Sequence, residues 1–253
     1  MEAVNLNYEI EGPEDAPIVV LSSSIGSSLS MWDEQMDALG ERFRVLRYDH
    51  RGHGKSPVPD GPYSMEELGR DVLSLVDSLG VERFSFCGLS LGGMVGMQIA
   101  SDAPERVEKL VLCCTAAELG PPSMWDERIE AVKSGGMESL VDAVMERWFT
   151  EGFAGNEKVE RMRRDFLDTP AEGYAACSAA IRDMDLRDRL PSIKADTLVV
   201  SASEDPATPP ERGEEIKNAI PNARMAVIPD ASHIANVEQP ERFTKEVLGH
   251  LDG

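Results

Sequence analysis

The sequence has little positive charge, few cysteines and no long apolar run. Its 253 residues carry 25 Lys and Arg against 46 Asp and Glu, a formal net charge of -21 at pH 7. So acidic a surface repels phosphates, which excludes nucleic acid and anionic membranes as expected partners. No apolar stretch reaches the roughly 20 residues that span a bilayer. The start of the chain shows no charged segment followed by an apolar one, so we expect no signal peptide.

The four cysteines are Cys87, Cys113, Cys114 and Cys177. They lie in apolar or helical surroundings and lack the spacing of metal ligands. We therefore expect buried free thiols, no metal site and a cytoplasmic location. The hydrophobic fraction of 42% is typical of a folded chain that buries a sizeable core.

Short apolar runs alternate with amphipathic stretches. A helix is expected to start where Ser64 and Glu67 have the spacing of a capping box, and further helices at about 91–103 and 240–251. The runs that favour strands are residues 18–21, 43–48, 84–87, 110–113, 197–200 and 225–228. This alternation predicts an α/β fold with a mostly parallel sheet and helices on both faces.

The alternation is interrupted between residues 116 and 190, where no run favours a strand. This segment contains helix-like stretches at 138–149, 157–167 and 174–184, and two of the three tryptophans, Trp125 and Trp148. A helical insertion of this length usually covers a pocket. We therefore predict a core of residues 1–115 and 191–253 and a helical cap of residues 116–190.

A Gly-x-Ser-x-Gly pattern occupies residues 88–92, directly after an apolar strand and at the start of a helix. This context is the one in which the pattern forms a nucleophile elbow, with the serine hydroxyl exposed at the carboxyl edge of the sheet. Ser90 is therefore the predicted nucleophile of an α/β-hydrolase fold. The amide of Leu91, at the helix N-terminus, is a predicted oxyanion donor.

A serine hydroxyl needs a base to remove its proton. In this fold the catalytic residues follow the order serine, acid, histidine. His50 and His53 precede Ser90, and His250 lies in the last predicted helix, where we expect it on the surface. His233, in the loop after the last strand, is therefore the predicted base.

Asp205 follows the strand at 197–200 and is the predicted acid that orients the imidazole. Glu118, after the preceding strand, is the alternative, because some hydrolases place the acid there. The second oxyanion donor is expected in the loop after the first core strand, where we assign the amide of Ile25.

Beyond these general motifs, several further segments match one known family: residues 21–26 with 30–32, 43–49 with 51–56, 86–93, 147–150, 172–174, 205–209 and 230–234. Through these segments the sequence resembles the 3-oxoadipate enol-lactonase family over nearly the whole chain. Ser23 and Cys114 depart from it, since the family often has Asn at both positions.

The resemblance implies a serine hydrolase of aromatic catabolism that opens 3-oxoadipate enol-lactone to 3-oxoadipate through an acyl-enzyme, without cofactor or metal. Substrate and product carry carboxylates, which a chain of charge -21 repels at long range. A basic group in the cap must offset this repulsion. Arg128 and Arg147 are the candidates, and Trp125 and Trp148 are candidate pocket walls.

Two other readings stay open at this point. Another cap-bearing carboxylesterase, lactonase or cofactor-free perhydrolase would share the three catalytic residues and differ in its pocket. A non-catalytic ligand receptor on the same fold would keep the pocket and lose the chemistry. The sequence does not decide the oligomeric state.

Overall fold

The computed structural model describes residues 2–253, so residue 1 of the expected core lies outside the described residues. A seven-stranded sheet forms the centre of the fold. The strand order is β1-β3-β2-β4-β5-β6-β7, and only β1 runs antiparallel to its neighbour. The strands are β1 (Tyr8–Glu11), β2 (Ile18–Ser22), β3 (Arg44–Tyr48), β4 (Phe84–Leu89), β5 (Val107–Cys113), β6 (Asp196–Ala202) and β7 (Arg224–Ile228). The predicted α/β class with a mostly parallel sheet is confirmed.

The sequence predicted the strands whose side chains are buried and missed the exposed one. Strands β2, β4 and β5 are buried almost throughout and form near-continuous apolar runs, as expected for strands covered on both faces. The edge strand β1 pairs Tyr8 with Tyr48 and exposes most of its side chains. The sequence did not predict strand β1, because an exposed edge strand needs no apolar run.

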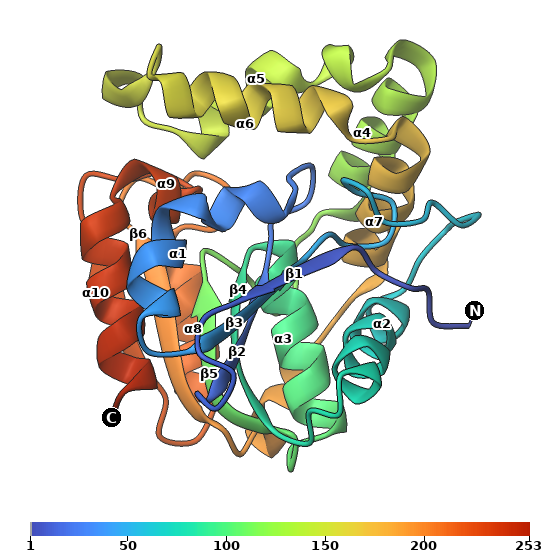
Figure 1. Ribbon diagram of the computed structural model, residues 1–253. Helices are drawn as coiled ribbons and strands as arrows, with labels where there is room; N and C mark the ends of the chain where they lie inside the picture. The colour runs from blue at the N-terminus through green and yellow to red at the C-terminus, as the bar shows by residue number, and fades with distance from the viewer. Residues whose placement is uncertain (1) are drawn as a thin grey trace.

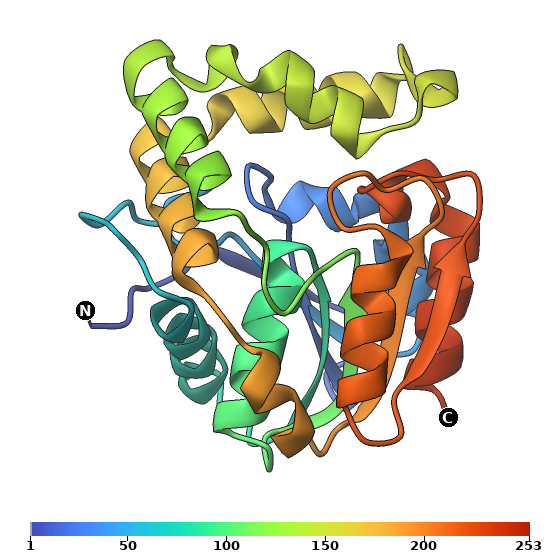
Figure 2. The same cartoon turned by 180° about the vertical axis from the view of Figure 1, so that it is seen from behind.

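Helices cover both faces of the sheet, as predicted (Figures 1 and 2). Helix α1 (Asp33–Gly40) packs beside α10 (Pro240–Leu251) on one face. The other face carries α2 (Met65–Ser78), α3 (Leu91–Asp102) and α8 (Pro210–Ala219). Helix α2 starts at the predicted capping box, in which Glu67 N donates to Ser64 Oγ at 3.3 Å and Ser64 N donates to Glu67 Oε2 at 3.0 Å.

The prediction that His250 lies on the surface is wrong. Its side chain is buried between α10 and the sheet. Its Nδ1 accepts from Arg224 at 2.8 Å, and its Nε2 lies 3.0 Å from the carbonyl oxygen of Asp196. The position of His250 within one helical turn did not reveal these partners, because both belong to strands far away in the sequence.

Residues 116–190 contain helices and no strand among the described residues. They form α4 (Pro122–Gly135), α5 (Val141–Trp148), α6 (Glu157–Asp168) and α7 (Ala171–Asp183), of which α4 was not predicted. Figure 1 shows α5 and α6 lying across one end of the sheet, with α4 and α7 side by side below them. A short helix, α9 (Ala235–Glu238), and four 3-10 turns complete the fold: Leu29–Trp32, Met137–Ser139, Glu151–Phe153 and Arg187–Ser192. Within residues 2–253, no helix has the length and apolarity needed to cross a membrane.

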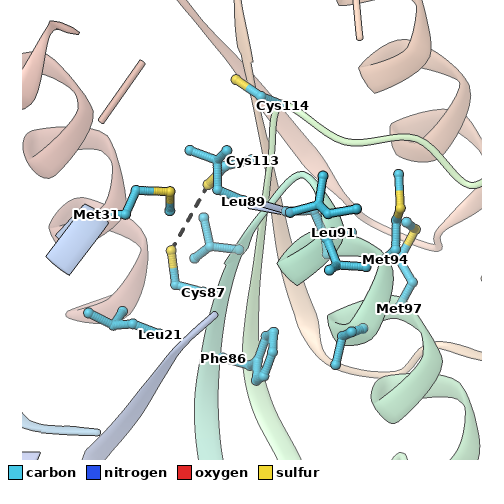
Figure 3. Close-up of a cluster of buried hydrophobic side chains, with 14 of the residues drawn as sticks. Leu21, Met31, Phe86, Cys87, Leu89, Leu91, Met94, Met97, Cys113 and Cys114 are labelled. Atoms are coloured by element: carbon cyan, nitrogen blue, oxygen red, sulfur yellow. Dashed lines mark hydrogen bonds between the residues drawn. The ribbon is translucent and has the colours of Figure 1, made fainter. Parts of the chain in front are cut away.

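The side chains around β4 form the centre of the core (Figure 3). Cys87 and Leu89 point to the side of Met31, whereas Phe86 points to α3, in line with the alternation of a strand. The sulfur atoms of Cys87 and Cys113 lie 4.0 Å apart without a disulfide. All four cysteines are free and buried, which agrees with the sequence-based expectation.

The first turn of α3 touches the end of β2, and this contact requires glycine at residue 92. A Cβ atom there would lie 2.1 Å from the carbonyl oxygen of Ser22. We predict that Gly92→Ala lowers the free energy of unfolding by about 3 kcal/mol or prevents folding, because backbone would have to move away. Urea unfolding measures the effect.

Gly249→Ala is the matched control. Gly249 lies in α10, and a Cβ atom there would meet nothing within 4 Å. This variant should gain up to about 1 kcal/mol, because alanine favours a helix. Equal effects of the two substitutions would contradict the close contact at Gly92.

Candidate active site

The turn from β4 into α3 holds Ser90 in a strained backbone conformation, with φ 57° and ψ -115°. Its amide donates to the carbonyl oxygen of Cys113 at 2.9 Å, and its carbonyl oxygen accepts from Thr115 Oγ1 at 2.8 Å. A Cβ atom at Gly88 would lie 2.2 Å from the carbonyl oxygen of Gly92. The turn is therefore as tight as a nucleophile elbow requires, and the hydrogen bonds to Cys113 and Thr115 stabilise its strained conformation.

His233 lies in the loop after β7 and is paired with Asp205, in the loop after β6. Its Nδ1 lies 2.8 Å from Asp205 Oδ2, and both side chains are buried. Asp205 also accepts from Thr208 Oγ1 at 2.7 Å and from the amides of Ala207 at 2.8 Å and Thr208 at 3.0 Å. Among the described residues, Nδ1 of His233 contacts Asp205 and Thr208 and makes no hydrogen bond with Glu118, the alternative acid.

These contacts favour the ionised form of the Asp205 side chain. Burial alone would raise the pKa of the Asp205 carboxyl, but the charge of His233 and the hydrogen bonds from His233 and Thr208 outweigh burial. The pKa of Asp205 therefore lies below its usual value, and the side chain is a carboxylate at neutral pH. A carboxylate beside Nδ1 favours the tautomer that leaves Nε2 free to accept a proton.

The loop after β2 carries the other expected oxyanion donor. Among residues 2–253, the amide of Ile25 donates to no group, whereas the next amide, of Gly26, donates to His53 Nε2 at 2.9 Å. Gly92 N donates to Ser23 O at 3.0 Å, which brings this loop against the elbow. Leu91 is the first residue of α3, so its amide has no acceptor within the helix.

Two buried histidines support this loop. Burial lowers the pKa of His50 to about 3 and that of His53 to about 4. Both are therefore neutral near pH 7. Neutral His53 can accept from Gly26 through Nε2, and its Nδ1 lies 3.3 Å from the carbonyl oxygen of Arg51. The sequence excluded these histidines as catalytic bases, but it did not reveal their contacts with the loop after β2.

A cavity of about 420 Å³ lies between the elbow and α4, α5 and α7. It brings Ser90 and His233 together with Ile25 and with all four predicted substrate-binding residues. Those four are Trp125, Trp148, Arg128 and Arg147. Sequence reasoning missed other lining residues, which include Met124, Val144, Tyr174, Pro206 and Arg212. Tyr174 and Pro206 lie in segments that carry the family resemblance, whereas Met124, Val144 and Arg212 lie outside those segments and had no signal in the sequence.

The walls of the cavity are aromatic. Trp125 is buried, and its Nε1 donates to the carbonyl oxygen of Leu119 at 2.7 Å. Trp148 packs edge-on against Phe166, with ring centroids 5.8 Å apart. Tyr174 also packs edge-on against Phe166, with ring centroids 5.5 Å apart. These contacts hold the rings in fixed orientations around a mainly apolar space.

Positive charge in the cavity comes from α4 and α5. The guanidinium of Arg128 lies 5.1 Å from the ring centroid of Trp125 and donates to Tyr174 Oη at 3.3 Å. Arg147 is half-buried; its burial, and next the like charge of Arg128, lower its pKa. Among residues 2–253, neither guanidinium has a carboxylate within 4 Å, and no Asp or Glu lines the cavity. Arg212 differs, since it pairs with Glu215 at 3.1 Å.

The neutral buried histidines predict a pH-dependent stability. In the unfolded chain each histidine has a pKa of about 6.5. Below that pH the two histidines bind protons in the unfolded state but stay neutral in the folded state. The free energy of unfolding therefore falls as the pH is lowered. Each histidine contributes a slope of up to about 1.4 kcal/mol per pH unit. Urea unfolding at pH values from about 7 to about 5 measures this slope.

His53→Gln is the variant that tests this source of the slope. Glutamine keeps an oxygen that can accept from Gly26 but cannot take up a proton in this range. The variant should lose stability less steeply than the wild type as the pH falls. Parallel curves for the two proteins would show that His53 does not contribute.

Similarity to known proteins supports the geometry. A family described as alpha/beta hydrolase fold matches residues 17–240. The 3-oxoadipate enol-lactonase 2 of Acinetobacter baylyi is 38% identical over 96% of this chain and 92% of its own length. A putative carbamate hydrolase of Rhizobium rhizogenes is 34% identical over 97% of both chains. The crystal structure of an enol-lactonase from Burkholderia xenovorans LB400 superposes with a TM-score of 0.96 and 45% identity, covering 100% of this chain and 99% of that one.

Within residues 2–253, no group of three or more His, Cys, Asp or Glu is arranged to hold a metal ion.

The match to the family covers most of the chain, including the elbow at Ser90 and the loop of His233. The relatives that share more than a third of its residues over nearly its full length include two enol-lactonases. The chain belongs to the alpha/beta hydrolase fold family and is a carboxylic ester hydrolase similar to the 3-oxoadipate enol-lactonases.

Proposed function

We propose that this enzyme opens the ring of 3-oxoadipate enol-lactone to give 3-oxoadipate, with Ser90, His233 and Asp205 as its catalytic triad. The observation that carries the proposal is the cavity beside Ser90, where two guanidiniums have no carboxylate partner. Residues 116–190 then act as a cap that supplies these charges, over a core of residues 1–115 and 191–253. The named enol-lactonase relatives support the choice of substrate.

The chemistry proceeds in two halves. Ser90 Oγ attacks the lactone carbonyl carbon while Nε2 of His233 takes the hydroxyl proton. The ring C–O bond breaks, and the departing enolate takes up the proton held by His233, which gives an enol that tautomerises to the ketone. Water then attacks the acyl-enzyme, with His233 as general base, and releases the acid and the free serine. The amides of Ile25 and Leu91 stabilise the oxyanion in both halves, and Asp205 stabilises the charged imidazole.

The free carboxylate of the substrate is the group that the cavity is suited to bind. A substrate without an anionic group, such as a neutral ester, would leave two half-buried like charges in the cavity without a carboxylate partner. A carboxylate placed between Arg128 and Arg147 would offset that repulsion and accept charge-assisted hydrogen bonds. Other esterase or perhydrolase activities use the same triad, so the arginines favour the lactone over them.

The first prediction for this activity concerns Ser90. Purified enzyme should convert the enol-lactone, and Ser90→Ala should lower kcat by about 10⁴-fold or more, because the nucleophile is lost. The reaction is measured as the loss of the absorbance of the lactone. A fluorophosphonate probe should label the wild type and not the variant. Fast turnover of simple aryl esters with no turnover of the lactone would reject the substrate and keep the triad.

The second prediction concerns the arginines. Arg128→Met and Arg147→Met should each raise KM by about tenfold or more for an aryl ester that bears a free carboxylate, because a hydrogen bond to a charged group is lost. For a neutral aryl ester of equal length, KM should stay within about twofold.

Arg212→Met is the control for charge at the cavity rim, since Arg212 is already paired with Glu215. It should change KM for the charged ester less than the other two substitutions do. If all three variants bind both esters like the wild type, the cap arginines are not the carboxylate site.

A further inference from the structure

The loop that carries His233 is hydrogen-bonded to the cap through the residues directly before and after His233. This histidine loop comprises residues 229–234, and the cap end comprises residues 147–150, where α5 ends. Ser232 Oγ donates to the carbonyl oxygen of Arg147 at 2.8 Å. Ile234 N donates to the carbonyl oxygen of Trp148 at 3.0 Å. The two residues of the cap end that line the cavity are therefore bonded to the neighbours of His233.

Glu238, in α9, joins the same two segments through its side chain. Its Oε2 accepts from the amide of Ser232 at 2.8 Å. Its Oε1 accepts from the amide of Thr150 at 3.1 Å and from the hydroxyl of Thr150. One carboxylate thus holds the histidine loop with one oxygen and the cap end with the other.

The surroundings of Glu238 suit a carboxylate and no other side chain of this length. The side chain is 7% exposed, and among residues 2–253 no basic group lies within 4 Å of it. Its three partners are all donors. Glutamine has a single acceptor oxygen and would turn its NH₂ group toward one of these donors. A carboxylate accepts at both oxygens and gains strength from its charge.

We infer that Glu238 is a positioning residue that holds the histidine loop and the cap end as one unit. Through this unit the imidazole of His233 and the guanidinium of Arg147 keep a fixed separation across the cavity. The inference rests on the proposed function, in which His233 is the base and Arg147 binds the substrate carboxylate. The cap then orders the base as well as the substrate.

Glu238→Gln tests the inference with two aryl esters of equal length, one with a free carboxylate and one neutral. A misplaced imidazole slows proton transfer for both esters, so kcat should fall about tenfold for each. A displaced cap end weakens only the charged ester, whose KM should rise about fivefold. A merely structural role would lower the folded fraction and therefore the rate for both esters, with neither KM changed.

Glu241→Gln is the matched control. It removes the same charge three residues further along, at an exposed position of α10 that has no hydrogen bond or ion pair to the histidine loop among the described residues. Its kcat and KM should equal those of the wild type for both esters. Wild-type kinetics in Glu238→Gln, or the same change in both variants, overturns the inference.

Thr150→Val keeps the test decisive if Glu238→Gln does not fold. It removes the hydroxyl bond to the cap end and leaves the bond between Glu238 and Ser232. KM should rise for the charged ester alone, and an unchanged KM overturns the inference. If Ser90→Ala abolishes turnover while Glu238→Gln matches the wild type, the triad stands and this inference fails. Turnover that survives in Ser90→Ala rejects the triad, whatever the Glu238 variant does.

Discussion

The contact between the first turn of α3 and the end of β2 is the constraint on which the site depends. Gly92 lets the two backbones touch, directly beside the strained turn at Ser90. Because β2, β4, β6 and β7 run parallel, their carboxyl ends lie along one edge of the sheet. The loops that carry Ile25, Asp205 and His233 leave from this edge, so a short distance separates groups far apart in the sequence.

The charge of the molecule acts on two length scales. The net charge of -21 repels an anionic substrate from a distance, but salt screens such repulsion beyond about 8 Å at physiological ionic strength. Inside the cavity short-range interactions dominate, and there α4 and α5 supply Arg128 and Arg147 without any carboxylate in the lining. An acidic chain can therefore offer a cationic pocket, since the excess of acid lies elsewhere on the surface.

Two buried polar side chains outside the proposed triad hold the loops of the site by accepting from backbone amides. His53 accepts from Gly26 in the loop after β2, and Glu238 accepts from Ser232 in the histidine loop. A buried amide without a partner costs free energy, so each acceptor favours one conformation of its loop. The strained elbow is thus surrounded by loops whose backbones are supported from inside the protein.

The sequence by itself determined the α/β class, the start of α2 at Ser64, the elbow at Ser90 and the segment without strands, because strand runs, helix caps and tight turns depend on neighbouring residues. It placed Asp205 and Glu118 at comparable strand ends, and it misplaced His250. The tertiary structure favoured Asp205 over Glu118 as the partner of His233, and only it buried His250 and placed Arg128 and Arg147 at one cavity. Those contacts join residues far apart in the chain, and their partners depend on how the sheet and helices pack together.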